Sequence, residues 1–362
     1  MPIEFAERTR RIPAYPLAGG YDLGADIAML ASNECCFAPL PEVVDAASSV
    51  LRGVNRYPDP SYMPLRRALA DRYGIPPQRI ALGNGSCDIL LAAGEALLEP
   101  GAEVVYAWPA FSVYPHLAAA SGARAIQVPL DDEDRHDLDA MATEVTVATR
   151  LVLVCNPNNP TSTAVGLDEI DAFMRRIPSH VAVILDEAYC EFSLTLGDTY
   201  ASLDLLRKYP NLVLLRTFSK VYGLAGLRVG YGLCGAEDFR VAVDQVRQPF
   251  YLNAAAQAAA VEALKHQDEV ERRVTETIAS RLEMEDAARA LGLWVARSDA
   301  NFIWLHLPET VEEADVVEGL QQRGVLVRAG ASLGRERSLR VTVGTDAENE
   351  RFADALAAVL AG

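Results

Sequence analysis

Five short apolar runs rich in valine, isoleucine and leucine set the strongest limit on how this chain can fold. They are Glu103–Ala107, Leu151–Cys155, Val181–Asp186, Leu212–Thr217 and Val229–Leu233. The runs are nearly continuous rather than alternating, a pattern typical of strands buried on both faces of a sheet. Helical patterns separate several of them, at Leu167–Ile177 and Tyr200–Lys208. This alternation predicts a three-layer α/β unit around a mainly parallel, doubly wound sheet.

The C-terminal part has a different pattern and predicts a second, smaller α+β unit. A helical stretch runs from Ala254 to about Leu291, and shorter strand and helix patterns follow it: Trp294–Leu307, Glu312–Arg323, Val325–Arg328, Ser338–Val343 and Ala347–Leu360. The first 40 or so residues form an irregular arm with several prolines and glycines. We therefore expect three parts: residues 1–40 as an arm with part of the small domain, 41–255 as the large domain, and 256–362 as the small C-terminal domain.

Charge and composition exclude several classes of protein. The formal net charge of −17 repels nucleic acid and anionic membranes. The N-terminus has no apolar run behind its basic residues, and no stretch reaches the roughly 18 apolar residues of a spanning helix. None of the six cysteines forms a C-x-x-C pair, which argues against zinc and redox sites. We expect a cytoplasmic protein without membrane or nucleic-acid partners.

Three further patterns are interpreted as structural. The acidic run Asp131–Asp139 lacks the sixth-position glycine and final glutamate of a calcium loop, so we expect a solvated turn before a helix capped near Asp137 or Asp139. Gly330–Gly334 fits G-x-S-x-G, but no helix follows it, which argues against Ser332 as a nucleophile. The five histidines show no H-E-x-x-H spacing, so no metal site is expected.

Polar residues follow three consecutive strands of the predicted sheet. Asn159 lies in the turn Asn156–Thr161, Asp186 ends the next strand, and Lys220 follows the third. Taken singly, Asp186 could be a helix cap and Lys220 a surface residue. Together they meet at one sheet edge, where α/β proteins bind ligands. Burial lowers the pKa of a lysine amine, as a Schiff-base nucleophile requires.

A glycine-rich turn, Gly83–Asp88, leads into a helical pattern. Such a turn offers backbone N–H groups and a positive helix end to a phosphate, although similar turns without ligands are common.

At this point the chain resembles the fold-type I pyridoxal-phosphate aminotransferases, most closely the histidinol-phosphate aminotransferase group. The resemblance runs nearly end to end and implies the aspartate-aminotransferase-like fold. Its motifs, in order, are Leu30–Glu34, Asn55–Asp59, Gly83–Asp88, Asn156–Thr161, Asp186–Tyr189, Ser219-Lys220 with Gly226–Arg228, and Ser338–Gly344.

The resemblance implies a role for each matching residue toward pyridoxal 5'-phosphate. Lys220 would form the Schiff base and then move a proton, and Asp186 would pair with the pyridinium N–H. Asn159 and Tyr189 would hydrogen-bond the ring oxygen, and Phe111 would stack on the ring. The cofactor phosphate would be held by Gly85, Ser86, Cys87, Ser219 and Arg228, with Tyr57 reaching it from the partner subunit of a homodimer.

On the substrate side, Arg340 would hold the carboxylate as a bidentate fork, and Asn33 would contact the same group. Arg328, with Tyr15, resembles the pair that in this group grips the far end of the substrate, including its phosphate. The resemblance therefore implies transamination of L-histidinol phosphate with 2-oxoglutarate, in histidine biosynthesis.

Two departures from the family pattern and several alternatives remain. Ser162 replaces the usual glycine and would cost on the order of 1 kcal/mol if φ is positive there. Cys87-Asp88 replaces the usual Asp-Glu.

Aromatic amino acid aminotransferases share the scaffold, and a phosphothreonine decarboxylase keeps the same lysine and aspartate. The sensor domain of a transcription regulator fits poorly, because no DNA-binding module precedes the arm.

Overall fold

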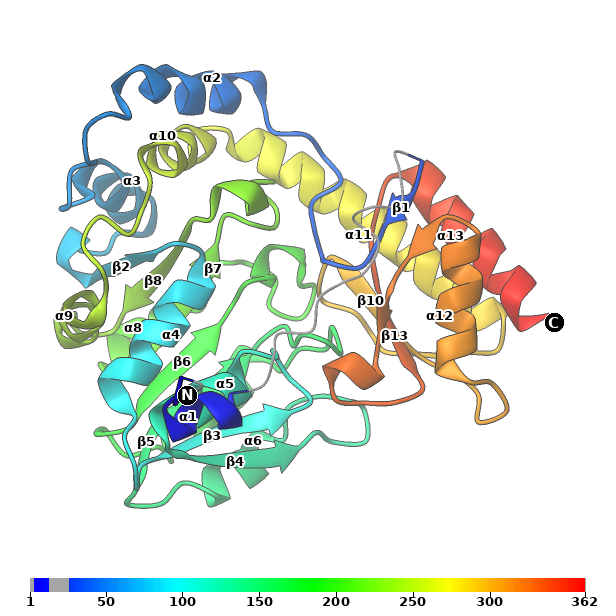
Figure 1. The fold of residues 1–362 in the computed structure, drawn as a ribbon, viewed down its shortest axis with the longest axis horizontal. Helices are drawn as coiled ribbons and strands as arrows, with labels where there is room; N and C mark the ends of the chain where they lie inside the picture. Colours follow the sequence, from blue (N-terminus) through cyan, green and yellow to red (C-terminus); the bar gives the residue numbers. More distant parts are fainter. Residues whose placement is uncertain (1–2, 13–25, 362) are drawn as a thin grey trace.

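The five apolar runs are strands of one sheet, hereafter the large sheet, in the computed structural model of the chain (Figure 1). The structure describes residues 3–12 and 26–361. The strands, in spatial order, are β2 (Ile80–Gly83), β8 (Gly230–Cys234), β7 (Leu212–Thr217), β6 (Ala182–Asp186), β5 (Thr149–Cys155), β3 (Glu103–Trp108) and β4 (Arg124–Pro129). Only β8 runs antiparallel to its neighbours, so the prediction of a mainly parallel sheet is confirmed.

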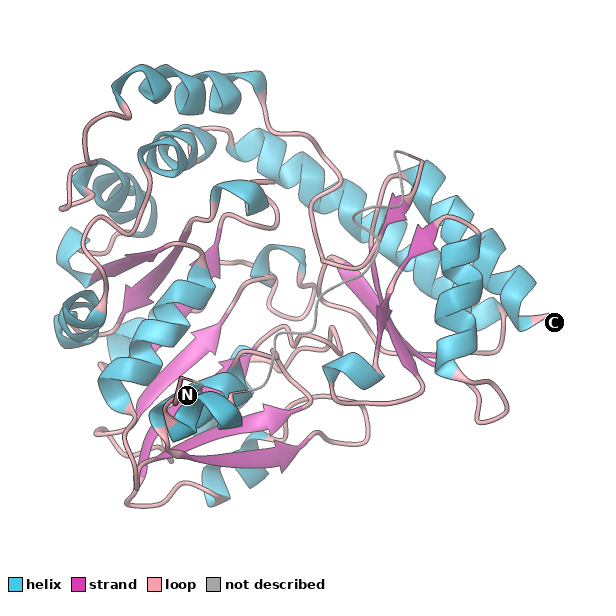
Figure 2. Cartoon of the chain, in the orientation of Figure 1, coloured by secondary structure: helices cyan, strands magenta, loops and turns pink. Residues whose placement is uncertain are grey.

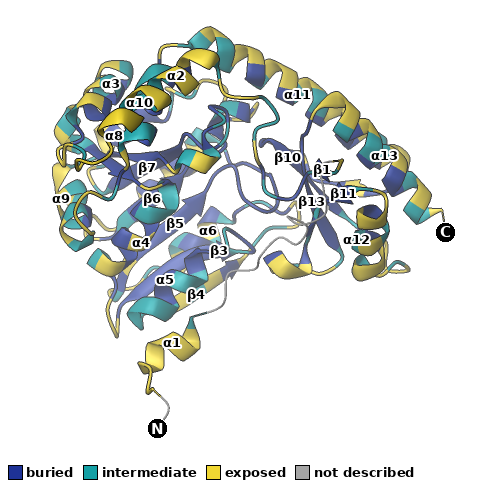
Figure 3. Cartoon of the chain, turned by 45° about the horizontal axis from the view of Figure 1, so that its top comes forward, coloured by how far each residue is buried: buried dark blue, intermediate teal, exposed yellow. Residues whose placement is uncertain are grey.

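Helices cover both faces of the large sheet (Figure 2). Successive side chains of a strand point to opposite faces, so Val104 packs in one core and Val105 in the other. One core contains α4 (Ser86–Leu97), α5 (Tyr114–Ser121) and α9 (Glu237–Val246). The other contains α2 (Pro41–Ser49), α3 (Met63–Tyr73), α6 (Leu138–Thr143), α7 (Leu167–Met174), α8 (Leu203–Lys208) and α10 (Ala254–Ala263). The expected three layers are present, with the strands as the middle layer, buried except at the edge strand β4 (Figure 3).

A second, antiparallel sheet, hereafter the small sheet, lies at the other end of the molecule (Figure 1). Its order is β12 (Arg328–Ala329), β13 (Ser338–Thr342), β10 (Phe302–His306) and β9 (Trp294–Val295). One face packs in a core with α11 (Gln267–Ala290), α12 (Glu313–Gln322) and α13 (Asp346–Leu360). The opposite face of β10 and β13, which includes Trp304 and Arg340, contacts the large sheet and the helices and loops around it.

Two of the elements expected in the C-terminal part are divided in the structure. The stretch Ala254–Leu291 is two helices, because His266 has the non-helical backbone angles φ −104° and ψ 63°. This break lets α10 pack on α2 while α11 continues to the small sheet. The expected strand Trp294–Leu307 is interrupted, and Asp299 in the gap accepts hydrogen bonds from Ser193 and Thr195.

The arm also differs from the irregular segment expected. It contains a short helix, α1 (Glu7–Arg11), and a strand, β1 (Ala28–Met29), that pairs in parallel with β11 (Val325–Leu326). Short 3-10 turns complete the fold: η1 (Val50–Gly53), η2 (Pro77–Arg79), η3 (Cys190–Phe192), η4 (Ala225–Leu227) and η5 (Ala331–Leu333).

One expectation about a short segment is confirmed. Asp137 caps α6, and its Oδ1 accepts from the backbone N–H of Ala140 at 2.9 Å. Across residues 3–12 and 26–361, no group of histidine, cysteine and acidic side chains could hold a metal ion. In that same part of the chain, none of the helices combines the length and apolar character needed to cross a membrane.

Candidate active site

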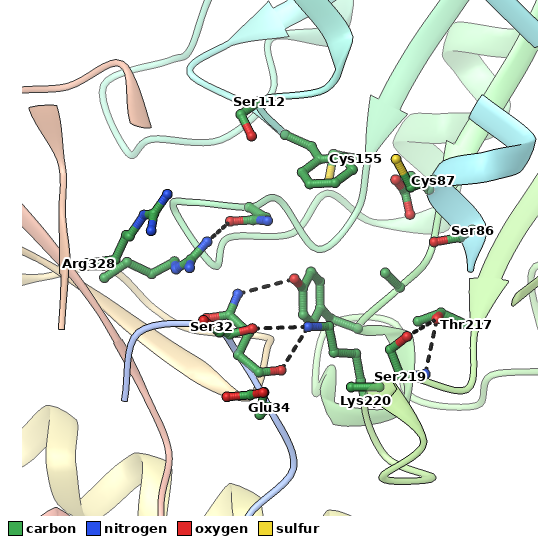
Figure 4. A pocket seen from close by; sticks show the side chains of 18 of the residues that line it. Ser32, Glu34, Ser86, Cys87, Ser112, Cys155, Thr217, Ser219, Lys220 and Arg328 are labelled. Atoms are coloured by element: carbon green, nitrogen blue, oxygen red, sulfur yellow. Dashed lines mark hydrogen bonds between the residues drawn. The ribbon is translucent and has the colours of Figure 1, made fainter. Parts of the chain in front are cut away.

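A cavity of about 320 Å³ lies between the edge of the large sheet and the small sheet (Figure 4). This volume lies in the range of small-molecule sites. Because β5, β6 and β7 are parallel, their carboxyl ends reach the same edge, as the sequence predicted. The predicted site residues that line the cavity are Asn33, Ser86, Cys87, Phe111, Asn159, Asp186, Tyr189, Ser219, Lys220, Arg228, Arg328 and Arg340.

Lys220 lies just beyond β7 and points its amine into the cavity. Its Nζ donates to the backbone oxygen of Asn33 at 2.8 Å and lies 5.5 Å from the centre of the Tyr189 ring. Desolvation, helped by the positive charges of Arg340 and Arg228 and opposed by Glu34, lowers the pKa of Lys220 to about 7. A substantial fraction of Lys220 is therefore unprotonated near neutral pH, as a nucleophilic amine must be.

This lowered pKa predicts how cofactor loading depends on pH. If Lys220 has a pKa of about 7, the neutral fraction rises from about a tenth at pH 6 to about nine tenths at pH 8. The rate constant for attachment of free pyridoxal phosphate to the apoenzyme should rise about tenfold over this interval and then level off. Stopped-flow absorbance measures it, with Nα-acetyl-lysine as the reference amine. If the ratio of the Lys220 rate constant to the Nα-acetyl-lysine rate constant stayed constant with pH, the pKa of Lys220 would be that of an ordinary lysine.

Asp186 ends β6 and is 4% exposed. Its Oδ2 accepts a hydrogen bond from the Tyr114 hydroxyl at 3.2 Å, whereas its buried Oδ1 makes none with any described residue. Burial raises the pKa of Asp186 to about 6, although the Tyr114 hydrogen bond opposes that rise. A buried carboxylate oxygen at a cavity wall needs a donor, and a pyridinium N–H of a bound cofactor fits that need.

A second group of residues at the start of α4 can hold a phosphate. Gly85 precedes the helix with φ +78°, and a side chain there would collide with the guanidinium of Arg228. The same guanidinium donates from Nη1 to Ser219 Oγ at 3.3 Å. Helix N–H groups, a hydroxyl and an arginine therefore converge on one point, as anion sites require. The carboxylate near Lys220 and this anion site fit the two polar ends of pyridoxal phosphate.

The side chain of Cys87 adds no charge to this anion site. Burial raises the pKa of its thiol to about 11, so the thiol is neutral at physiological pH. The replacement of the family's usual aspartate therefore leaves the anion site without an opposing carboxylate at this position.

Two arginines of the small sheet face the other side of the cavity. Arg340 donates from Nη1 to Asn159 Oδ1 and from Nη2 to the backbone oxygen of Ala31, both at 2.6 Å. Arg328 lies directly opposite Arg340 in the β12–β13 ladder, so both side chains are on one face. Two guanidinium groups side by side on one face provide several N–H donors for an anionic ligand.

The arm closes the cavity with Asn33. Its Nδ2 donates to the Tyr189 hydroxyl at 3.1 Å, and its Oδ1 accepts from Thr342 Oγ1 at 3.2 Å. The residue is 1% exposed and has φ +53°. Asn33 thereby connects the large sheet's Tyr189 to the small sheet's Thr342 beside the amine of Lys220.

The departure at Ser162 has the conformation that the family comparison suggested. Ser162 has φ +62° and is fully buried, and its backbone oxygen accepts from the N–H of Asp299 at 2.7 Å. The cost of a positive φ at serine, on the order of 1 kcal/mol, is therefore present in the fold.

The structure does not bring all predicted residues into this cavity. Tyr57 is 80% exposed and stacks on Phe250 with ring centres 4.4 Å apart, away from the lining. Tyr15 lies outside the described residues. The sequence reasoning also missed Tyr114, three positions after Phe111, whose only signal was its place on the same face of the turn into α5.

The fold and this cavity together define a pyridoxal-phosphate-dependent enzyme, with an amine, a buried carboxylate and a phosphate site around one space. The chain belongs to the aminotransferase class I and II family, whose model matches residues 25–356. Its cofactor is therefore pyridoxal phosphate, and its substrates are amino and oxo acids or related amines.

Relatives with two different names are similar to the chain over most of its length. It is 45% identical to an aromatic amino acid aminotransferase of Thermobifida fusca, over 90% of this chain and 88% of the relative. It is 43% identical to histidinol-phosphate aminotransferase 1 of Nitrosococcus oceani, over 91% of this chain and 88% of the relative.

Solved structures confirm the expected fold. The histidinol-phosphate aminotransferase of Sinorhizobium meliloti, in complex with pyridoxal-5'-phosphate, matches with a TM-score of 0.86 at 30% identity, covering 99% of this chain and 97% of that chain. The aspartate aminotransferase of Thermus thermophilus with maleate has a TM-score of 0.85 at 22% identity, covering 99% of this chain and 100% of that chain.

Proposed function

We propose that the protein transfers the amino group of L-histidinol phosphate to 2-oxoglutarate. The observation that supports this choice is the cross-strand pair Arg328 and Arg340 at the cavity. The phosphate ester of the donor carries about two negative charges near pH 7, and 2-oxoglutarate carries two carboxylates. Both substrates thus bring two negative charges to two neighbouring guanidinium groups that can donate charge-assisted hydrogen bonds to them.

We assign the cofactor-binding roles to the residues around the cavity. Pyridoxal phosphate supplies an aldehyde that captures the substrate amine and a ring that withdraws electrons from it. When the cofactor is bound, Asp186 would hold the ring nitrogen in its protonated form, and Asn159 and Tyr189 would donate hydrogen bonds to the ring oxygen. Phe111 would lie against the ring. The phosphate would be held by Gly85, Ser86, Cys87, Ser219 and Arg228.

The catalytic proton is assigned to Lys220. With the cofactor bound, Lys220 would take a proton from the substrate carbon that bears nitrogen and would return it on the cofactor side. Its lowered pKa, about 7, allows both directions near neutral pH because neither protonation state is strongly favoured. Arg340 and Asn33 hold the substrate anion so that this carbon lies near Lys220.

The homodimer is part of the same proposal. Tyr57 is 80% exposed, and Leu51 and Val54 near it are 56% and 63% exposed. Such neighbouring apolar residues on a surface are typical of an interface. A partner subunit that covers them would bring its own Tyr57 to this chain's phosphate site, as in the family that the sequence resembles.

An aromatic amino acid is the second candidate donor, because relatives of that name reach 45% identity. The apolar lining residues Phe111 and Leu333 give this candidate physical support, since an aromatic ring gains free energy when buried against apolar groups. An aromatic amino acid carries a single carboxylate, which Arg340 alone can hold.

The arginine pair provides the test that separates the two donors. The wild-type holoenzyme is mixed in separate experiments with histidinol phosphate, phenylalanine or glutamate, and the loss of the cofactor's visible absorbance is followed. We expect the highest rate constant at low substrate with histidinol phosphate. In Arg328→Gln this rate constant should fall about 100-fold with histidinol phosphate but less than about fivefold with phenylalanine. The doubly charged phosphate loses its contact with Arg328, whereas the single carboxylate of phenylalanine keeps its contact with Arg340.

If the holoenzyme reacts efficiently with phenylalanine but not with histidinol phosphate, histidinol phosphate is rejected as the donor and an aromatic amino acid takes its place. The matched control is Arg323→Gln, an exposed arginine at the end of α12, which should leave all three rate constants unchanged.

A further inference from the structure

Asp134 is buried, although it belongs to the acidic run that the sequence indicated as a solvated turn. It lies between β4 and α6 and is 1% exposed, whereas Asp132 and Glu133 beside it are exposed. Its φ of +60° is uncommon for a residue other than glycine. A buried carboxylate in a strained backbone persists only where its surroundings hold it strongly.

The carboxylate of Asp134 is held by the small sheet. Its Oδ2 accepts from Trp304 Nε1 at 3.1 Å and lies 2.8 Å from His306 Nε2. Its Oδ1 accepts from Arg335 Nη1 in an ion pair. The side chain of Asp134 is 2% exposed in these pairs, so solvent and salt screen them little.

The backbone of Asp134 is held by the large sheet's cofactor loop. Its carbonyl oxygen accepts from Thr161 Oγ1 at 2.9 Å and from Thr163 Oγ1 at 2.6 Å. These threonines follow Asn159 in the turn after β5. A single residue therefore joins the loop of Asn159 to strand β10 of the small sheet.

Strand register carries this connection to the substrate-facing arginines. Trp304 pairs with Arg340 across β10 and β13, and Arg340 pairs with Arg328 across β13 and β12. Residues paired in this way have side chains on one face of the sheet. The face that Asp134 holds through Trp304 is thus the face that presents both arginines to the cavity.

The turn that contains Arg335 also contacts the large sheet at Trp108, next to the contact of Arg335 with Asp134. Gly334 lies so near Trp108 at the end of β3 that an added Cβ would be 2.7 Å from the indole ring. In Figure 1 the connection after β4 reaches the turn before β13, on the side of the molecule away from α11, and the Asp134–Arg335 contact joins the two segments. The two units are therefore joined by α11 on one side and by Asp134 and Gly334 on the other.

We propose that Asp134 is a positioning residue for substrate binding: it fixes the small sheet, and with it Arg340 and Arg328, at the distance from Asn159 that an anionic substrate requires. The inference rests on the aminotransferase family and on the two arginines as anion-binding groups, and not on the identity of the amino donor. The groups assigned to the cofactor lie on the large sheet's unit. Loss of Asp134 should therefore weaken substrate binding and leave cofactor binding unchanged.

The test compares Asp134→Asn with Asp132→Asn, an exposed neighbour in the same run, as holoenzymes. For Asp134→Asn we expect KM for both the amino donor and 2-oxoglutarate to rise about tenfold, with kcat and the pyridoxal phosphate dissociation constant within about twofold of wild type. The dissociation constant of maleate, a dicarboxylate that cannot be transaminated, should rise by a similar factor. Asp132→Asn should match wild type in all five quantities.

Failure of the wild type to bind maleate or 2-oxoglutarate would count against the arginine pair itself and not against Asp134 alone. A folded Asp134→Asn protein with an unchanged KM would overturn the proposal. A fall in kcat and in cofactor affinity that accompanies the rise in KM would also overturn it, because that combination indicates a general structural role. If Asp134→Asn does not fold, Arg335→Gln replaces it, because it weakens the same contact from an arginine whose side chain is 41% exposed. Where both variants fold, their effects on KM should be non-additive in the double variant.

Discussion

Replacing Lys220 by alanine is expected to lower kcat by about 10⁴-fold, the largest effect of any single substitution in this chain. The variant loses both the amine that attaches the cofactor and the group that moves the proton on the substrate. No other lysine can substitute, since the sequence contains two more, Lys208 and Lys265, and both are exposed. Steady-state assay with the preferred donor measures the loss.

The small number of lysines makes the attachment itself measurable. Borohydride reduction of the wild-type holoenzyme followed by peptide mass analysis should place the cofactor on Lys220 and on neither Lys208 nor Lys265. Lys265→Ala is the matched control and should keep wild-type turnover, because its exposed amine pairs with Glu262 on α10. Native turnover by Lys220→Ala would contradict the assignment of the catalytic residue.

Much of the cavity could be predicted from the sequence because it is built at the ends of parallel strands. Asn159, Asp186 and Lys220 follow β5, β6 and β7, and parallel strands end at one edge whatever the loops between them do. The glycine-rich turn before α4 was recognisable for a similar reason, since a helix start and its glycine are adjacent in sequence.

Contacts between distant segments could not be predicted in this way. Asp134 and Trp304 are 170 positions apart, and neither the acidic run nor the apolar pattern of β10 indicates that they meet. Tyr114 reaches Asp186 across 72 positions of sequence, and its spacing from Phe111 does not indicate that contact. The break between α10 and α11 also escaped prediction, because the residues Lys265-His266-Gln267 include neither glycine nor proline.

Net charge and local charge have opposite signs in this protein. The chain has a formal charge of −17, yet Arg228, Arg328 and Arg340 line the cavity together with Lys220. At short range a few fixed guanidinium groups outweigh distant surface carboxylates, since salt screens charges beyond about 8 Å. The anionic cofactor and substrates are therefore attracted once they are inside the cavity, despite the acidic surface.

Of the arginines in the cavity, Arg340 should have the largest effect on kcat/KM for the substrates. In Arg340→Gln we expect kcat/KM to fall about 10³-fold for every donor, about 4 kcal/mol, because each donor keeps a negative charge that is then buried without its partner. Arg340→Lys should recover part of the loss, since an ammonium restores the charge but not the two-point fork. The fold should survive, as Asn159 and Ala31 lose only hydrogen bonds from one side chain.

The comparison with Arg328→Gln separates the two arginines. Arg340→Gln should affect histidinol phosphate, phenylalanine and glutamate alike, whereas Arg328→Gln should affect chiefly the donors with two negative charges. Equal effects of the two substitutions on phenylalanine would mean that its carboxylate lies between both guanidinium groups, and the assignment of Arg340 alone to that carboxylate would be wrong. If Arg340→Gln instead left kcat/KM unchanged while the cofactor still bound, the substrate anion must be held elsewhere, because no other residue of β13 presents a positive charge to this cavity.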